Sequence, residues 1–263
     1  MLTLALEDFD IKQIADSGQC FRMYRVENDT WEIFALNRFL TIQKKEDTHI
    51  FYCDQKEFDD FWYNYFDLQT DYGKIKKRIL MTKDEYLIKS VNFGSGLRIL
   101  RQDLWETIVS FIVSQQNNIP RIKGCLKKLC EINGERFPTS TDFLNFREKD
   151  LDSVKLGYRK NYLLKISESV SNGSFDLEKL KEMSYPEAMK YLKTLYGVGD
   201  KVANCIALFG LQHIKAFPID VWIKRILETR YYNDFSLERW NLQDIGGIVQ
   251  QYMFFYERSL KYS

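Results

Sequence analysis

Hydrophobic and polar residues alternate over the first 60 residues of the chain. Residues 30–36, 38–44 and 49–53 are rich in β-branched and aromatic residues. An Asn-Asp pair precedes the first segment, and a Glu-Asp pair separates the second from the third. Alternation of this kind predicts strands that expose one face and bury the other, joined by tight turns. We therefore expect an antiparallel β-sheet near the N-terminus.

The period changes to that of a helix near Glu57. Helical patterns then continue to the last expected helix, at residues 245–260. The fold class predicted is α+β, with an N-terminal antiparallel sheet domain containing some helices at residues 1–95 and a mostly α-helical core at residues 96–263. A Gly-Ser-Gly joint at residues 94–96 separates the two, and the last helix could pack back on the N-terminal domain. The aromatic stripe that follows Glu57 indicates a buried face and not a stacking surface: Phe58, Phe61, Trp62 and Tyr65.

Residues 184–211 predict two helices joined by a tight hairpin. The first helix opens with the capping-box sequence Ser-Tyr-Pro-Glu. Gly197 stands where a helix end favours positive φ, and Gly199 should let the chain reverse without a Cβ clash. Asp200 is expected to cap the second helix. The apolar face of that helix would consist of Val202, Cys205, Ile206 and Phe209.

This hairpin combines an anion site with candidate catalytic groups. The N–H groups of Gly197, Val198 and Gly199 are expected to point outward at a helix N-terminus, which favours a phosphate. Lys201 follows in the first turn, where the helix dipole opposes a cation and favours a neutral amine nucleophile. Asp220 follows a further helix and a Pro-containing turn, so its carboxylate could fold back near the lysine.

Composition narrows the function classes. A hydrophobic content of 45% indicates a globular protein, and a net charge of +1 means that any DNA-binding surface must be local. The five cysteines are scattered without a CxxC pair, which argues against a disulfide framework or zinc site and fits a reducing cytoplasm. Only two histidines are present, which disfavours histidine triads. We expect neither a signal peptide nor a membrane span.

Three further stretches carry polar or aromatic groups with two readings each. Four amides at residues 115–118 could contact bases or phosphates, and a solvated loop is an equal alternative. Tyr158 and Arg159 could serve as a wedge and a base contact, although a helix start with a basic flank is commoner. Gln250 and Phe254 share one face of the last helix, where core packing is the default for Phe254.

The hairpin and the turn after it resemble the helix-hairpin-helix, Gly/Pro-Asp superfamily of DNA glycosylases. The similar segments are Leu-x-Gly-Val-Gly-x-Lys-Val-Ala-x-Cys at residues 195–205 and Pro-x-Asp-Val at residues 218–221. In this superfamily a lysine at the position of Lys201 marks the bifunctional members. The chain lacks the C-terminal four-cysteine cluster of the iron–sulfur branch, so no cofactor and no metal are expected. The hairpin could hold a monovalent cation once DNA is bound.

Within the superfamily, the chain is similar to the Ogg-type 8-oxoguanine DNA glycosylases. The similarity extends from Ser-Gly-Gln-x-Phe-Arg at residues 17–22 to the last helix. It implies that the carbonyl of Gly18 accepts a hydrogen bond from N7–H, which 8-oxoguanine has and guanine lacks. It also implies that Cys205 and Phe254 sandwich the flipped base, and that Gln250 reads its Watson–Crick edge.

The resemblance assigns a second group of residues to the site that the flipped base vacates. Arg121 and Arg159 would contact the orphaned cytosine, and Tyr158 would wedge into the stack. Gln116 would have to replace the first residue of an Asn-Asn-Asn run found in animal members. Two further residues depart from those members. Trp222 stands at a phosphate-contacting histidine, whose role is not carried over, and Asn204 replaces an aspartate beside the lysine.

The sequence therefore predicts a monomeric, cytoplasmic or DNA-associated enzyme that removes 8-oxoguanine opposite cytosine from double-stranded DNA and then cuts the strand. Lys201 would attack the sugar C1′ and form a Schiff base, and Asp220 would stabilise the developing positive charge. Two alternatives remain open. The chain could be a glycosylase for another damaged purine, such as an alkylated base, or a helix-hairpin-helix module that binds DNA without catalysis.

Overall fold

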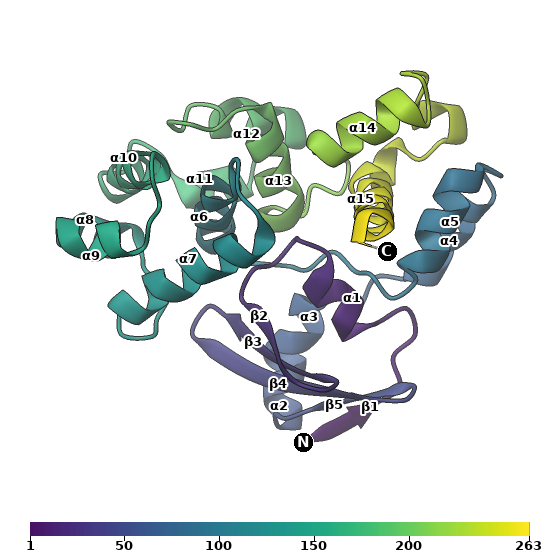
Figure 1. Ribbon diagram of the computed structural model, residues 1–263, viewed down its shortest axis with the longest axis horizontal. Coiled ribbons are helices and arrows are strands. Elements are labelled where there is room, and N and C mark those ends of the chain that lie inside the picture. Colours follow the sequence, from purple (N-terminus) through teal and green to yellow (C-terminus); the bar gives the residue numbers. More distant parts are fainter. Residues whose placement is uncertain (263) are drawn as a thin grey trace. The chain divides into compact units, whose positions relative to one another are not determined.

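A computed structural model of the chain describes residues 1–262 (Figure 1). The chain forms two compact units. The first contains Met1–Ile33, Phe39–Arg101 and the segment from His213 onward, and the second contains Phe34–Arg38 and Gln102–Gln212. The domain division predicted near residue 95 stays a prediction.

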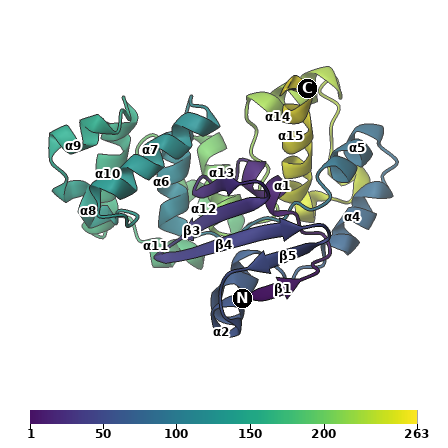
Figure 2. The ribbon, with the colours of Figure 1, turned by 60° about the horizontal axis from the view of Figure 1, so that its bottom comes forward.

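The sheet has five strands in the order β1-β5-β4-β3-β2 (Figure 2). Its antiparallel pairs include β1 with β5, β4 with β5, and β2 with β3. The three strands predicted from alternation are confirmed as β3, β4 and β5, and the pattern missed β1 and β2. The strand bounds are β1 Leu2–Leu4, β2 Met23–Glu27, β3 Thr30–Ala35, β4 Arg38–Lys45 and β5 Thr48–Phe51.

A helical segment follows the sheet and covers it with aromatic side chains. It consists of α2 (Gln55–Glu57), a π-helical turn (η1, Phe58–Trp62) and α3 (Tyr63–Tyr65). Asp54 caps its start by accepting a hydrogen bond from the backbone N of Glu57 at 2.7 Å. The predicted aromatic face is mostly a packed surface. Phe58, Trp62 and Tyr65 are buried, whereas Phe61 is partly exposed.

Two other helices of the first unit pack directly on its C-terminal helix. The long helix α15 packs against α5 and α14, and α5 also packs against α4 (Figure 1). The Tyr86 hydroxyl of α5 donates a hydrogen bond to the Glu257 carboxylate of α15 at 2.8 Å. The bounds are α1 Ile11–Asp16, α4 Tyr72–Leu80, α5 Glu85–Phe93, α14 Val221–Thr229 and α15 Gly246–Tyr262, with short 3₁₀ turns η2 (Glu238–Trp240) and η3 (Gln243–Ile245) before α15.

The second unit is mainly helical and is built around α6. This helix is capped by Asp103, as predicted, and it packs against α7, α10 and α13. Together, the sheet of the first unit and the helices of the second confirm the predicted α+β class. The bounds are α6 Leu104–Ser114, α7 Ile119–Ile132, α8 Ser140–Asn145, α9 Glu148–Ser153, α10 Arg159–Ser171, α11 Leu177–Lys181, α12 Tyr185–Leu192 and α13 Asp200–Gly210.

Burial is the common feature of the cysteines, since all five side chains lie in the interior. Burial raises the pKa of the Cys125 thiol, which keeps it protonated near neutral pH. Within residues 1–262, no cluster of three or more His, Cys, Asp or Glu side chains could hold a metal ion. Nor does any helix in this part of the chain combine the length and apolar character needed to cross a membrane.

Candidate active site

The predicted helix-hairpin-helix is present in the second unit as α12, a tight turn and α13. The backbone N of Ser184 donates to the Glu187 carboxylate at 3.0 Å, which completes one half of the expected capping box. Gly197 has the predicted positive φ, at +82°, but the first helix ends earlier, at Leu192 with Lys193 as its C-cap, so the expectation that Gly197 caps this helix is wrong. A Cβ atom at this position would also lie 2.4 Å from the Tyr162 ring. Both the backbone and the packing therefore require glycine here.

Three expectations for the rest of the turn are wrong. The residue that caps α13 is Gly199, and Asp200 is instead the first helical residue, with its carboxylate 2.9 Å from the Lys193 ammonium. The N–H of Val198 donates to the Leu195 carbonyl at 3.1 Å, so it does not point outward. Gly199 has φ −99°, which any residue can adopt, so chain reversal does not require glycine at this position.

Two N–H groups of the turn remain available to a ligand. Within residues 1–262, the N–H groups of Gly197 and Gly199 have no hydrogen-bond acceptor. A Cβ at Gly199 would meet no protein atom within 4 Å, so the backbone there faces open space. These groups precede the N-terminus of α13, where the helix dipole favours an anion. The expected phosphate site is thus narrower than predicted, with two donors instead of three.

Lys201 is the second residue of α13 and is partly exposed. Its Nζ lies 5.5 Å from the centre of the Phe111 ring. Within the described residues of its own unit, Nζ makes no ion pair and no hydrogen bond. Cys205 lies one helical turn further on and is buried. The amine is therefore held against an aromatic face without being neutralised by a carboxylate from this unit.

The four-amide segment is mostly structural. The Gln115 side chain donates to the carbonyl of Gly197 at 3.0 Å, which joins this segment to the hairpin. Asn117 donates to the Val113 carbonyl at 3.0 Å. Asn118 caps α7 by accepting from the backbone N of Arg121 at 3.0 Å. Only Gln116, with φ +46°, combines an exposed side chain with an unusual backbone conformation.

The residues expected at the vacated base differ in exposure. Tyr158 is 44% exposed, and Arg121 is also at the surface, where its guanidinium donates to the Lys155 carbonyl at 3.2 Å. Arg159 is only 4% exposed. Its guanidinium donates to the carbonyl of Gln115 at 2.8 Å and to that of Gln116 at 2.9 Å. Arg159 therefore supports the amide segment in this structure instead of presenting its charge outward.

Sequence reasoning missed a row of tyrosines between the wedge residue and the hairpin. The rings of Tyr158 and Tyr162 are 5.3 Å apart, and those of Tyr162 and Tyr196 are also 5.3 Å apart. Tyr162 is the residue that fills the space beside Gly197. Its spacing of four residues from Tyr158 was the available signal, because residues at i and i+4 share a helix face.

Asp220 belongs to the first unit and caps α14. Its Oδ1 accepts hydrogen bonds from the backbone N of Trp222 at 3.0 Å and of Ile223 at 2.9 Å. These two bonds fix the orientation of a partly exposed carboxylate. Trp222 stacks near the Arg225 guanidinium, with the charge 5.5 Å from its ring centre.

Gln250 and Phe254 lie one turn apart on α15. Gln250 is 4% exposed, and its Nε2 donates to the Pro218 carbonyl at 3.1 Å. Its Oε1 is buried and has no hydrogen-bond partner among the described residues. A buried acceptor left unpaired costs about 1–3 kcal/mol, which makes it a mark of a ligand site. Phe254 is partly exposed, so the default assignment to the core does not account for it fully.

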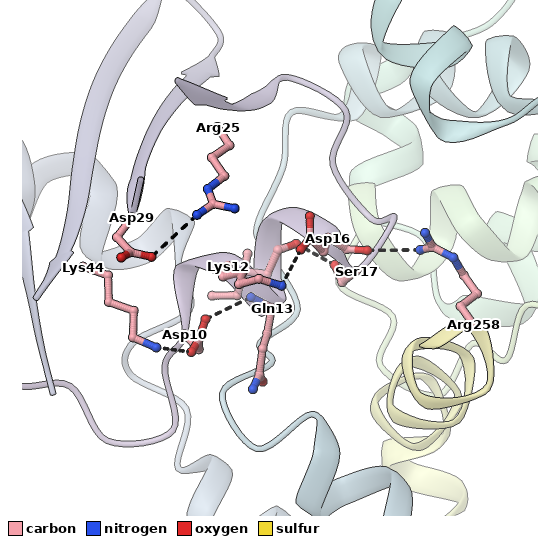
Figure 3. A network of polar contacts seen from close by, with 10 residues as sticks. Asp10, Lys12, Gln13, Asp16, Ser17, Arg25, Asp29, Lys44 and Arg258 are labelled. Atoms are coloured by element: carbon pink, nitrogen blue, oxygen red, sulfur yellow. Dashed lines mark hydrogen bonds and ion pairs between the residues drawn. The ribbon is translucent and has the colours of Figure 1, made fainter. Parts of the chain in front are cut away.

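Gly18 lies just after α1 and has φ +78°. The residues before it are bonded to α15. The Ser17 carbonyl accepts from Gln251 at 2.8 Å. The Asp16 carbonyl accepts from Arg258 at 3.1 Å, as Figure 3 shows. Sequence reasoning missed both α15 residues. No local pattern could reveal them, because the two bonds join opposite ends of the chain.

The predicted site residues thus fall into two groups, one in each unit. The first unit holds Gly18, Asp220, Gln250 and Phe254, of which Gln250 and Phe254 share one helix. The second unit holds the hairpin with Lys201 and Cys205, joined through Gln115 to the group formed by Gln116, Arg121, Tyr158 and Arg159.

Two family models together match most of the chain. Residues 1–108 match the 8-oxoguanine DNA glycosylase N-terminal domain, and residues 109–235 match the HhH-GPD superfamily of base excision DNA repair proteins. The probable N-glycosylase/DNA lyase of Methanothermobacter thermautotrophicus is 30% identical over 230 residues, which are 73% of this chain and 72% of that protein. The N-glycosylase/DNA lyase of Saccharomyces cerevisiae is 32% identical over 158 residues, which are 52% of this chain and 42% of the yeast protein.

A solved structure agrees over nearly the whole length. The Clostridium acetobutylicum 8-oxoguanine glycosylase/lyase, in complex with double-stranded DNA containing cytosine opposite 8-oxoG, is 38% identical to this chain. The superposition has a TM-score of 0.88 and covers 97% of this chain and 93% of that one. The chain therefore belongs to the 8-oxoguanine DNA glycosylase/lyase family, within the HhH-GPD superfamily of base excision DNA repair proteins.

Proposed function

We propose that this DNA glycosylase and lyase removes 8-oxoguanine paired with cytosine from double-stranded DNA, with Lys201 as its nucleophile. The observation that carries the proposal is the position of the Lys201 amine and its surroundings. Its amine stands in the first turn of α13, beside the two available N–H groups of the hairpin, and no carboxylate of its own unit neutralises it. A lysine kept only for solubility would have no reason to occupy a helix N-terminus, which disfavours its charge.

The reaction follows from an amine nucleophile and a deoxyribose electrophile. Nζ of Lys201 forms a bond to C1′, and the bond from C1′ to N9 of the base breaks, so the base leaves with the electron pair and takes up a proton. Opening of the sugar ring then gives a Schiff base between Nζ and C1′. Loss of a proton from C2′ breaks the bond from C3′ to the 3′ phosphate oxygen, which cuts the strand. Hydrolysis of the Schiff base returns the lysine.

Asp220 is proposed to stabilise the positive charge that develops on the sugar as the base leaves. A carboxylate can do this without bond formation, as carboxylates do in glycoside hydrolysis. The two backbone bonds to its Oδ1 support this role, because they fix the direction of the carboxylate before the substrate arrives. Asp220 would also assist proton transfer from the lysine amine.

Base recognition is proposed to rest on Gln250 and Gly18. Guanine-type bases present N–H donors on the Watson–Crick edge, and the buried Gln250 Oε1 is an acceptor without a partner among the described residues. The carbonyl of Gly18 would accept from N7–H, which distinguishes the lesion from guanine. The stacking roles of Cys205 and Phe254 stay predictions.

Preference for cytosine would come from the exposed residues of the second unit. Arg121 and Tyr158 are at the surface, which suits a base contact and a wedge. Gln116 is exposed at the tip of the amide segment and would fill the gap left by the base. Arg159 would reach the orphaned cytosine only after leaving the carbonyls of Gln115 and Gln116, so we assign it first to holding that segment.

The DNA backbone is proposed to approach the open side of the hairpin. The N–H groups of Gly197 and Gly199 would bind a phosphate, and the missing Cβ of Gly199 would allow close approach. A monovalent cation at this turn also stays a prediction, for which the Gly197 carbonyl, already bonded to Gln115, has a second lone pair. We expect the enzyme to act as a monomer, without a cofactor, in a reducing compartment that contains DNA.

A panel of duplexes tests the proposal. Single-turnover excision would be measured for 8-oxoguanine opposite each of the four bases, and for an alkylated purine opposite its normal partner. We expect 8-oxoguanine opposite cytosine to react fastest. Faster excision of the alkylated purine would overturn the proposed lesion. Equal rates opposite all four bases would instead overturn the roles of Arg121 and Gln116 at the orphaned cytosine.

A further inference from the structure

The backbone on the N-terminal side of Gly18 is tied to α15 by two side chains. Gln251 Nε2 donates to the Ser17 carbonyl at 2.8 Å, and both residues are almost completely buried. Arg258 Nη1 donates to the Asp16 carbonyl at 3.1 Å (Figure 3). These bonds act on the two peptide groups that directly precede Gly18.

The other side of Gly18 is held by Gln19. Its Nε2 donates to the Ser17 hydroxyl at 2.9 Å and to the Arg98 carbonyl at 2.8 Å, and its Oε1 accepts from the backbone N of Leu100 at 2.8 Å. Gly18 itself is partly exposed. The peptide groups around it are therefore fixed on both sides, while Gly18 stays accessible to a ligand.

Arg258 also touches the aromatic side chain that the resemblance assigns to the base. Its guanidinium lies 5.3 Å from the centre of the Phe254 ring, one helical turn away on the same face of α15. Cation–π contact restrains the ring without covering both of its faces. One side chain thus links the segment before Gly18 to Phe254.

We propose that Gln251 and Arg258 are positioning residues that set the selectivity for 8-oxoguanine over guanine. This inference rests on the proposed function, in which the Gly18 carbonyl accepts from N7–H. Guanine has no proton at N7, so discrimination depends on the distance and direction of one carbonyl. Hydrogen bonds weaken steeply outside about 2.7–3.2 Å and below about 120°. Release of the preceding peptide groups would allow the carbonyl to move out of that range.

The test compares two measurements: the binding of duplexes that contain the nucleobase, and the reaction of Lys201 with an abasic site, which has no nucleobase to recognise. In a Lys201→Gln background, the dissociation constants would be measured for duplexes that contain guanine or 8-oxoguanine opposite cytosine. Gln251→Met and Arg258→Met remove the donors and keep apolar volume. The binding ratio is the dissociation constant for the guanine duplex divided by that for the 8-oxoguanine duplex. We expect each substitution to lower this ratio about fivefold to tenfold, which is the effect of one lost hydrogen bond. The same two substitutions would also be made in the protein that keeps Lys201. There, the rate of borohydride trapping on a duplex with a preformed abasic site should stay within about twofold of the rate of the unsubstituted protein.

Two further variants separate positioning from folding. Lys12→Met removes the contact of Lys12 with the Asp16 carboxylate at 3.1 Å and leaves the Asp16 carbonyl bonded, so its binding ratio should equal that of the parent. Arg258→Lys keeps a donor and should recover at least half of the lost ratio. Because Arg258 lies at the surface edge of the network, its variants test the inference even if Gln251→Met folds poorly.

The outcomes are distinct. A lower binding ratio together with unchanged trapping on the abasic site supports the proposal that Gln251 and Arg258 are positioning residues. An unchanged binding ratio in Arg258→Met would overturn the proposal. A fall in abasic-site trapping that matches the loss of binding would overturn it as well. If the Lys201→Gln parent itself shows no preference for 8-oxoguanine, the proposed function fails and this inference fails with it.

Discussion

Replacing Gly197 with alanine should destabilise the protein, whereas the same change at Gly199 should not. The two glycines stand two residues apart in one turn, but their environments differ. Gly197 has φ +82°, and a Cβ there would lie 2.4 Å from the Tyr162 ring. Gly199 has an extended backbone, and a Cβ there would meet nothing within 4 Å.

The magnitude follows from two separate costs. An L-residue in the left-handed region costs about 1–2 kcal/mol, and an overpacked contact typically costs about 1–3 kcal/mol. Gly197→Ala should therefore lower the free energy of unfolding by about 2–5 kcal/mol, out of a total that is typically about 5–15 kcal/mol. Gly199→Ala should stay within about 1 kcal/mol of the parent, because alanine mainly restricts the unfolded chain.

Urea unfolding followed by circular dichroism measures both values. A loss of this size would lower the midpoint for Gly197→Ala by on the order of 1–2 M urea. Gly199→Ala should keep its midpoint but bind duplex DNA about tenfold more weakly, because its Cβ would enter the space assigned to a phosphate. Equal midpoints for the two variants would refute the packing argument. Unchanged DNA binding by Gly199→Ala would refute the phosphate assignment.

Three further predictions address stability, base recognition and the wedge. Burial lowers the pKa of His49 from 6.5 to about 4, so between these values the unfolded chain binds more protons than the folded chain. The free energy of unfolding should therefore fall by about 3 kcal/mol as the pH drops through that window, and urea titrations of His49→Leu should show most of this fall abolished. Gln250→Leu removes the unpaired buried acceptor but also the hydrogen bond from Nε2 to the Pro218 carbonyl, so the two effects should largely offset and leave the unfolding midpoint nearly unchanged, while single-turnover excision of 8-oxoguanine should slow at least about tenfold. Unchanged excision would exclude Gln250 from base recognition. Tyr158→Ala should slow excision at saturating DNA more than it slows borohydride trapping on a preformed abasic site, because it removes the wedge and not the nucleophile; equal slowing of both reactions would contradict the wedge assignment.

Sequence rules for capping, turns and periodicity predicted the features that depend on residues close together in the chain. The capping residue Asp103, the positive φ of Gly197 and the apolar face of α13 depend on neighbours within a few residues, and all three are confirmed. The strands β1 and β2 were missed because β1 has only three residues and β2 is largely exposed, so neither alternates for long enough to be recognised.

The details of the site depend on long-range contacts that periodicity does not carry. Arg159 looked like an exposed basic flank, but its guanidinium is buried because the carbonyls of Gln115 and Gln116 accept its hydrogen bonds. The bonds from Gln251 and Arg258 span 234 and 242 residues of sequence, so only the tertiary structure reveals them. The prediction that the Val198 N–H points outward failed for a local reason, because this N–H donates to the carbonyl of Leu195 within the hairpin turn.

The most direct test of the central claim is borohydride trapping of the enzyme on a duplex that contains 8-oxoguanine opposite cytosine. Reduction converts a Schiff base into a stable covalent complex, which a denaturing gel separates from free DNA. Lys201→Gln would be compared with Lys193→Gln, which removes a neighbouring amine that pairs with Asp200 at 2.9 Å. We predict a covalent complex for the parent and for Lys193→Gln, and none for Lys201→Gln. A complex that survives in Lys201→Gln would contradict Lys201 as the nucleophile.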